Sequence, residues 1–160
     1  MRYIKIDIAT QRLQLFDEDV VILEWLVSTA YKGVGELAGS GCTPRGWFVI
    51  RAKVGKNCPI NSVFVGRRFT GEIYSPDYRV RYPQRDWILT RLLWLGGLEP
   101  TKNRYGEVDT LRRFIYIHGC PDEEPMGIPL SHGCIRMRNQ DIMTLFEQVD
   151  VGTRVLIVEH

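Results

Sequence analysis

Residues 117–134, IHGCPDEEPMGIPLSHGC, contain the triplet His-Gly-Cys twice, at 118–120 and again at 132–134. Histidine and cysteine side chains bind zinc, and they also serve as the base and the nucleophile of thiol enzymes. Whether these four side chains hold a metal or perform acyl chemistry decides how the rest of the chain is interpreted.

The whole chain has the size and composition of one soluble domain. Its 160 residues are 44% hydrophobic and 25% charged, with a formal net charge of +2. We expect a single domain over residues 1–160, because no linker, repeat or low-complexity tract divides the chain. The small net charge and the scattered basic residues argue against nucleic acid and anionic membranes as partners.

The N-terminal residues MRYIKIDIATQRLQLFD alternate charged and apolar side chains. They contain neither the continuous apolar segment nor the small-residue cleavage site of a secretory signal. No apolar run is long enough to cross a membrane. We therefore expect a cytoplasmic protein whose four cysteines are reduced, namely Cys42, Cys58, Cys120 and Cys134.

Alternating apolar and polar residues predict a mainly β fold. The segments with this pattern are RYIKIDIA, RLQLFD, VVILEWLVST, WFVIRAKVG, SVFVGRRF, GEIYSPDYRV, RRFIYIHG and GTRVLIV. DWILTRLLWLGGLEP fits a helix or a strand, and the following Gly-Gly and the surrounding strands favour a strand. One helix is expected over NQDIMTLFEQV, with Asn139 as its N-cap.

A zinc site made of His118, Cys120, His132 and Cys134 is one alternative. The residue types suit zinc, but a single glycine separates each histidine from its cysteine. Structural zinc sites usually place two or more residues between neighbouring ligands, so that both side chains point inward. The spacing therefore argues against this non-catalytic metal-binding alternative.

A cysteine nucleophile is the alternative that the pattern favours. Cys134 follows Gly133, and a glycine allows the backbone to approach a ligand closely. His118, at the end of its predicted strand, is the candidate base. The amide of Cys134 and those of its neighbours are candidate donors of an oxyanion hole, in which one donor is typically worth ~3 kcal/mol. Papain-like and NlpC-type thiol peptidases place the cysteine before the histidine, the reverse of the order here.

The segment IYIHG, followed by MGIPLSHGCIRM and a helix, resembles the L,D-transpeptidase catalytic (YkuD) domain. The motif of that family is a histidine, a spacer of a dozen or more residues, and Ser/Thr-His-Gly-Cys. STAYKGVGELAGSGCTPRGWFVI and VGTRVLIV also resemble family segments, so the resemblance spans the chain. It implies a mainly β sandwich domain with one helix after the catalytic cysteine.

Four catalytic positions are implied by this resemblance. Cys134 would be the nucleophile and His118 the general acid/base. The main chain at Gly119 would accept the hydrogen bond that fixes the imidazole tautomer, in place of the carboxylate of an ordinary triad. The amides of Gly133 and Cys134 would form the oxyanion hole. No metal and no cofactor is implied.

Further roles follow from the same resemblance. Ser131 and His132 would support the nucleophile's loop at the substrate-binding site, and Arg136 would hold the site or a substrate carboxylate. Thr43 would be structural. Cys120 stands where the family often has threonine, and two alternatives are open for it: a passive small residue, or the partner of Cys134 in a reversible disulfide.

The resemblance implies acyl transfer on peptidoglycan stem peptides. The thiolate attacks the carbonyl of the third residue, expels the terminal D-alanine and forms a thioester. Water then releases a tripeptide, whereas an amine gives a 3-3 cross-link or an exchanged D-amino acid. The expected cytoplasmic location favours water, and hence an L,D-carboxypeptidase that trims tetrapeptide muropeptides or nucleotide-linked precursors during recycling. Carbapenem-type inhibitors are expected to acylate Cys134.

Overall fold

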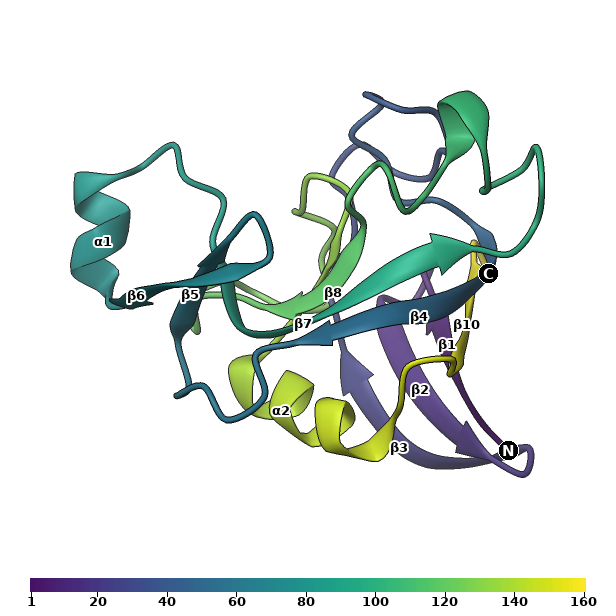
Figure 1. The fold of residues 1–160 in the computed structure, drawn as a ribbon, viewed down its shortest axis with the longest axis horizontal. Helices are drawn as coiled ribbons and strands as arrows, with labels where there is room; N and C mark the ends of the chain where they lie inside the picture. Colours follow the sequence, from purple (N-terminus) through teal and green to yellow (C-terminus); the bar gives the residue numbers. More distant parts are fainter.

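A computed structural model describes residues 1–160, and it is mainly β (Figure 1). Its two α-helices are α1 (Pro76–Arg81) and α2 (Asn139–Gln148), and a 3-10 turn spans Gly106–Val108. The ten strands are β1 (Arg2–Asp7), β2 (Arg12–Asp17), β3 (Val20–Leu26), β4 (Gly46–Val54), β5 (Ser62–Val65), β6 (Arg68–Ile73), β7 (Ile88–Gly97), β8 (Tyr116–Gly119), β9 (Ile135–Met137) and β10 (Arg154–Val158).

The strands form one hydrogen-bonded sheet in the order β3-β2-β1-β10-β4-β7-β5-β6, and β8 joins this path by pairing with both β7 and β9. Most neighbours are antiparallel, but β1–β10 and β8–β9 are parallel pairs. The prediction of a mainly β domain is confirmed, and the ambiguous segment before Gly96 is the long strand β7. No helix has the length and apolar character needed to cross a membrane.

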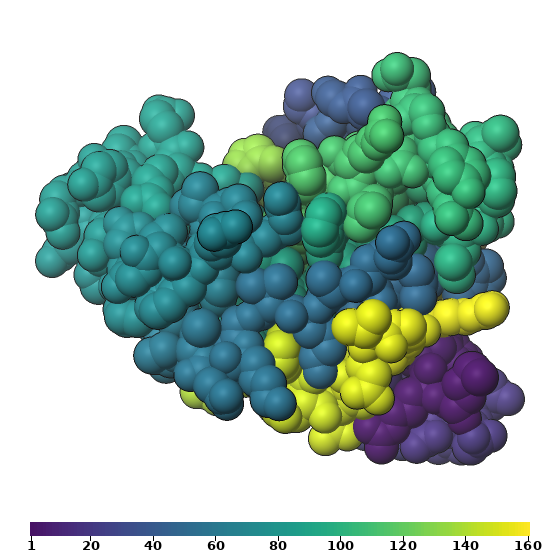
Figure 2. Space-filling model, in the orientation of Figure 1, coloured from purple at the N-terminus to yellow at the C-terminus, as the bar shows by residue number.

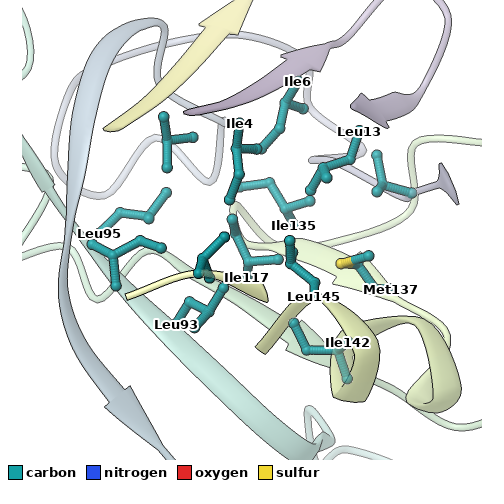
Figure 3. Packing of buried hydrophobic residues seen from close by; sticks show 14 of the residues in the cluster. Ile4, Ile6, Leu13, Leu93, Leu95, Ile117, Ile135, Met137, Ile142 and Leu145 are labelled. Atoms are coloured by element: carbon teal, nitrogen blue, oxygen red, sulfur yellow. The ribbon is translucent and has the colours of Figure 1, made fainter. Parts of the chain in front are cut away.

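The sheet curls over itself and encloses the main core (Figure 3). Ile4 of β1 and Leu13 of β2 face Ile117 of β8 and Ile135 of β9 across this core, and Leu145 of α2 closes it. All five side chains are fully buried, and each such burial typically contributes about 1.5–3 kcal/mol. The two layers implied by the family resemblance therefore belong to one continuous sheet.

A bulge in β7 sets the position of β8. Leu89 lies opposite Gly119, and Leu92 lies opposite His118, so β7 uses more residues than β8 over the same distance. Thr90, inside this bulge, has a φ of 75°, which is rare for a β-branched residue. The bulge brings the end of β8, which carries His118, against the start of α2.

The prediction of a single strand over GEIYSPDYRV is wrong in its second half. β6 ends at Ile73, and α1 begins at Pro76. Proline is favoured in the first turn of a helix because its missing N–H would have no partner there. The chain therefore has a second α-helix besides the predicted one, and α1 lies at the end of the molecule far from both termini (Figure 1).

The predicted helix after the second His-Gly-Cys is confirmed, but its N-cap is wrong. Arg138 occupies the cap position, and no side chain caps the helix. Asn139 is the first helical residue and is 0% exposed. Its amide donates to Cys120 O at 2.9 Å and accepts from Thr90 Oγ1 at 2.6 Å. The side chain thus serves a tertiary network, which a local capping rule does not consider.

Candidate active site

The parallel pair β8–β9 places His118 and Cys134 on the same face of the sheet. Ile117 lies opposite Ile135, and both enter the core. Because successive strand residues point to opposite faces, their neighbours His118 and Cys134 face the other side. The Tyr116 amide donates to Cys134 Sγ at 3.3 Å, which fixes Cys134 beside the start of β8.

His118 is held as a neutral base. It is only 1% exposed, and its Nδ1 lies 2.6 Å from the carbonyl oxygen of Gly119. A carbonyl oxygen only accepts hydrogen bonds, so Nδ1 carries the proton and Nε2 carries the free lone pair. Burial lowers the pKa of His118, although the charge of Asp86 acts in the opposite direction. The imidazole is therefore neutral at neutral pH, and Nε2 is able to take a proton.

Cys134 is held as a protonated thiol. Burial raises its pKa to about 12, and Sγ donates to Phe114 O at 3.4 Å. No hydrogen bond joins Sγ to His118 in this structure. Catalytic hydrogen bonds often tighten only when substrate binds. Because the thiol is protonated, attack on a carbonyl requires a base, and His118 is the neutral imidazole on the same face.

The loop before Cys134 is shaped by backbone geometry and two hydroxyl groups. Gly133 has a φ of 133°, a conformation that residues with a Cβ rarely adopt. Thr43 Oγ1 donates to Gly133 O at 2.9 Å. Ser131 Oγ donates to Cys134 O at 2.5 Å and accepts from the Gly133 amide at 3.2 Å. The Cys134 amide has no acceptor within the protein, so its N–H is free to donate to a ligand.

Arg136 and His132 share one carboxylate. Arg136 is 8% exposed, and its guanidinium lies 3.3 Å from Asp86 Oδ1 and 3.8 Å from Glu124 Oε2. The side chain of His132 is 75% exposed, and its Nδ1 lies 3.6 Å from Asp86 Oδ2. Asp86, which precedes β7, was not predicted, because no sequence pattern connects it with the His-Gly-Cys loop. The carboxylates of Asp86 and Glu124 balance the charge of Arg136. This pairing favours a structural role for Arg136, which holds the site together, over the binding of a substrate carboxylate.

Three pockets meet at His132. The first, called the acyl pocket here, has a volume of about 400 Å³ and is lined by Gly66, Arg67, Asp86, Ile88, Arg113, Phe114, Ile115, Tyr116, His132 and Cys134. The second has a volume of about 480 Å³, and its walls include Arg79, Arg85, Trp87, Glu124 and Arg136. The third has a volume of about 380 Å³ and includes Gly39, Arg112 and Arg113.

The walls of these pockets come from parts of the chain far apart in sequence. Figure 2 shows the surface hollowed between the teal lobe that carries α1 and the green segment that precedes β8. Cys134, which is half-buried, lines the first of these pockets. His118 is buried and lines none of the three pockets.

The four side chains of the zinc alternative do not converge. No group of three or more His, Cys, Asp or Glu side chains has the geometry to hold a metal ion. All four cysteines are free. Cys120 lies four residues beyond Tyr116, the neighbour of Cys134, so the two cysteines are about 13 Å apart along the strand direction. A disulfide would need Cα atoms closer than about 7 Å, so the geometry leaves Cys120 as a buried thiol that donates to Met137 O.

Comparison with known proteins gives one consistent relationship. The L,D-transpeptidase catalytic domain (YkuD) family matches residues 1–157. A probable L,D-transpeptidase of Escherichia coli K12, YbiS, is 49% identical over 111 residues, which are 68% of this chain and 35% of that protein. The chain therefore matches about a third of the length of this relative.

Solved structures share the fold at low sequence identity. The L,D-transpeptidase of Xylanimonas cellulosilytica (its residues 123–326) superposes with a TM-score of 0.62 at 20% identity, over 98% of this chain and 60% of that chain. LdtMt1, solved in complex with imipenem, has a TM-score of 0.58 at 18% identity, over 98% of this chain and 58% of that one. The sequence motif, the site geometry and the match over nearly every residue agree: the chain belongs to the L,D-transpeptidase catalytic domain (YkuD) family.

Proposed function

We propose that this domain transfers acyl groups of peptidoglycan stem peptides through a thioester on Cys134. One observation carries the proposal: the Gly119 carbonyl fixes the proton on Nδ1 of His118, and so leaves Nε2 as a base on the face that carries the thiol. A neutral imidazole beside a neutral thiol is the starting state of general-base catalysis.

The proposed first half-reaction forms the thioester. Nε2 of His118 accepts the proton of Cys134 Sγ, and the sulfur attacks the carbonyl carbon of the third peptide residue. The Cys134 amide, which has no other acceptor, donates to the oxyanion of the tetrahedral intermediate. When the intermediate collapses, the C–N bond breaks, and the D-alanine amine leaves with the proton from His118.

The proposed second half-reaction uses water. His118 accepts a proton from the water, the hydroxide oxygen attacks the thioester carbonyl, and the C–S bond breaks. The proton returns to sulfur, and a tripeptide with a free carboxylate leaves. The acyl pocket, which Cys134 lines, has room for water beside the thioester, and water is the most abundant acceptor in the cytoplasm. Both points support hydrolysis and hence an L,D-carboxypeptidase. We place this reaction in the cytoplasm, with tetrapeptide muropeptides or nucleotide-linked precursors as substrates, and fractionation of cells that express the native gene tests the location.

A second candidate is transfer to an amine. It is supported by the relatives, whose names are those of L,D-transpeptidases. Two pockets flank the acyl pocket at His132 and offer room for a second peptide. The chemistry of the first half-reaction is the same in both candidates, and only the acceptor differs.

Mass spectrometry of the products from a purified tetrapeptide muropeptide tests the proposal and separates the two candidates. With and without an added D-amino acid, we expect loss of D-alanine to water. Dimers or exchanged products would establish amine transfer instead. Cys134→Ala should abolish every product, whereas Cys58→Ala, which alters a cysteine outside the three pockets, should retain activity. Full turnover by Cys134→Ala would refute the nucleophile.

A further inference from the structure

The acyl pocket carries two arginines that have no carboxylate partner. Arg67 lies in the turn between β5 and β6, and Arg113 precedes β8. Neither comes within 4.0 Å of an Asp or Glu oxygen. The arginines of the neighbouring 480 Å³ pocket differ, since Arg79, Arg85 and Arg136 each pair with a carboxylate. The acyl pocket therefore has an excess of positive charge beside the nucleophile.

Arg67 is held in place by neutral groups. Its guanidinium lies 4.7 Å from the ring centroid of Trp94 and 4.9 Å from that of Phe114. It also donates to the Tyr116 hydroxyl at 3.2 Å. Such stacking orients the planar cation without neutralising it. The remaining N–H groups stay available to a ligand.

Arg113, the residue before Phe114, is also held by neutral groups, but through hydrogen bonds rather than aromatic stacking. Its guanidinium donates to Cys42 O at 2.7 Å, to Gly35 O at 3.2 Å and to Ser40 Oγ at 3.3 Å. All three acceptors are uncharged. Burial lowers the pKa of Arg113, the sign of a cation that has lost part of its hydration. A half-buried cation without a counterion is unfavourable, and a bound anion would remove this cost.

The only carboxylate that lines the acyl pocket does not offset these charges. Asp86 lies in the wall of the pocket, but it is paired with Arg136. An anionic ligand in this pocket would therefore meet two oriented cations, Arg67 and Arg113. Arginine recognises carboxylates through two parallel N–H bonds. Arg67 donates only from Nη1, to Tyr116, and keeps Nε and Nη2 free for such a pair. Arg113 uses both Nη2 hydrogens and one on Nη1, so it offers a carboxylate single hydrogen bonds from its remaining N–H groups.

We propose that Arg67 and Arg113 bind free carboxylates of the acyl donor, so that this domain selects stem peptides that carry carboxylates over those that carry amides at the same positions. The inference rests on the proposed function and specifies its substrate class. A tetrapeptide donor has candidate carboxylates on its second residue and, when the third residue is diaminopimelate, on that side chain. Neither arginine touches the reacting atoms, so both are specificity-determining residues.

The test uses three tetrapeptides with the same scissile bond. One carries isoglutamate and diaminopimelate, the second has isoglutamine at position two, and the third has an amide on the diaminopimelate side chain. For the wild type we expect kcat/KM to fall about 10- to 100-fold on at least one amidation, the range of a charge-assisted hydrogen bond. The ratio of kcat/KM for the carboxylate peptide to kcat/KM for the amidated peptide measures this preference. In Arg67→Met or Arg113→Met the ratio should fall toward 1, because kcat/KM decreases for the carboxylate peptide and is unaffected for the amidated peptide.

Arg68→Met is the matched control, since Arg68 is exposed, neighbours Arg67 and lines none of the three pockets. It should retain the wild-type ratio. Arg113→Lys preserves the charge and should keep part of the preference. A general structural defect would lower kcat/KM of all three peptides by the same factor and leave the ratio unchanged.

Equal turnover of all three peptides by the wild type would overturn this inference and leave the proposed function standing. Arginine variants in which kcat/KM falls by the same factor for every peptide would also overturn this inference. Absence of D-alanine release from every peptide would instead overturn the proposed function, and the inference with it.

Discussion

Adding one methyl group at Gly119 should separate the two tasks of this residue, which are to fit beside α2 and to orient His118. A Cβ at this position would lie 2.5 Å from Leu89 O and 2.5 Å from Asn139 Oδ1. Real Cβ atoms essentially never approach closer than 3.0 Å, so Gly119 and its two neighbours must move apart by about 0.5 Å in Gly119→Ala. One of the two obstacles is a main-chain carbonyl of β7, which is unable to rotate away.

The expected loss of stability is modest. Overpacking of a closely packed site costs about 1–3 kcal/mol, and the lower backbone entropy of alanine offsets about 0.5–1 kcal/mol of this. A net loss of about 1–2 kcal/mol corresponds to a decrease in Tm of roughly 2–8 °C for a domain of this size. A domain of typical stability, about 5–15 kcal/mol, stays folded at 25 °C.

The expected loss of activity is larger. The Gly119 carbonyl accepts the Nδ1–H bond of His118 at 2.6 Å, and a displaced carbonyl no longer fixes the tautomer and the ring orientation. Misplacement of a catalytic group by about 1 Å typically costs about 100-fold, so we expect kcat to fall roughly 10- to 100-fold. The assay is D-alanine release at 25 °C, together with thermal unfolding of the same samples.

Gly96→Ala is the matched control. The three atoms nearest to its Cβ would all belong to Arg51, with Cγ at 2.7 Å, so the Arg51 side chain must shift. We expect a comparable loss of stability, about 1–3 kcal/mol, but wild-type turnover, because Arg51 contacts neither His118 nor Cys134 in the hydrogen bonds of the site. Wild-type kcat and Tm in Gly119→Ala would refute the reasoning. Equal losses of kcat in the two variants would show that the effect on activity is not specific to His118.

Three further predictions concern the hydrogen-bond network, the titration of the site and its inhibition. Asn139→Ala should lower the free energy of unfolding in urea by about 2–4 kcal/mol, because Cys120 O and Thr90 Oγ1 lose buried partners. Gln140→Ala, at an exposed position, should change this free energy by less than about 0.5 kcal/mol. Equal effects of the two substitutions would contradict the prediction. Burial lowers the pKa of His118, so kcat/KM should stay level from pH 9 to below pH 6.5. It should fall only as the pH drops through the lowered pKa, because His118 then becomes protonated and is no longer a base. A decrease of kcat/KM centred at pH 7 or above would contradict the buried neutral imidazole. Imipenem should add its mass to the wild type and to Cys58→Ala but not to Cys134→Ala, and an adduct on Cys134→Ala would place the reactive thiol elsewhere.

The burial of His118 also makes the free energy of unfolding depend on pH. Its pKa is lowered in the folded state, so below the unfolded value of about 6.5 the unfolded chain binds the extra proton first. The stability that the neutral imidazole contributes is fully present above pH 6.5 and is lost as the pH falls toward the folded pKa. Measuring urea unfolding between pH 5 and pH 7.5 for the wild type and His118→Gln would reveal this slope in the wild type alone.

The sequence by itself determined the local elements and the motif. Period-two alternation predicted β1, β8 and β10, and helical spacing predicted α2, because both patterns record which face of an element meets the core. The resemblance of SHGCIRM to a family motif predicted Cys134 and His118 as a pair, and the structure places them on one face of a parallel strand pair. Their catalytic roles, with those of Ser131, His132 and Arg136, stay predictions until the variants are measured.

Only the tertiary structure decided which distant residues surround this pair. Asp86, Arg67 and Arg113 reach the site from three separate connections, and their spacing in sequence carries no signal of it. Asn139 has the side chain of a good N-cap, yet it is buried against the bulge at Thr90 and the end of β8. The physical reason is common to both cases: a local pattern reports the period of one element, whereas hydrogen bonds and charges at a site depend on the pairing of elements that are far apart in the chain.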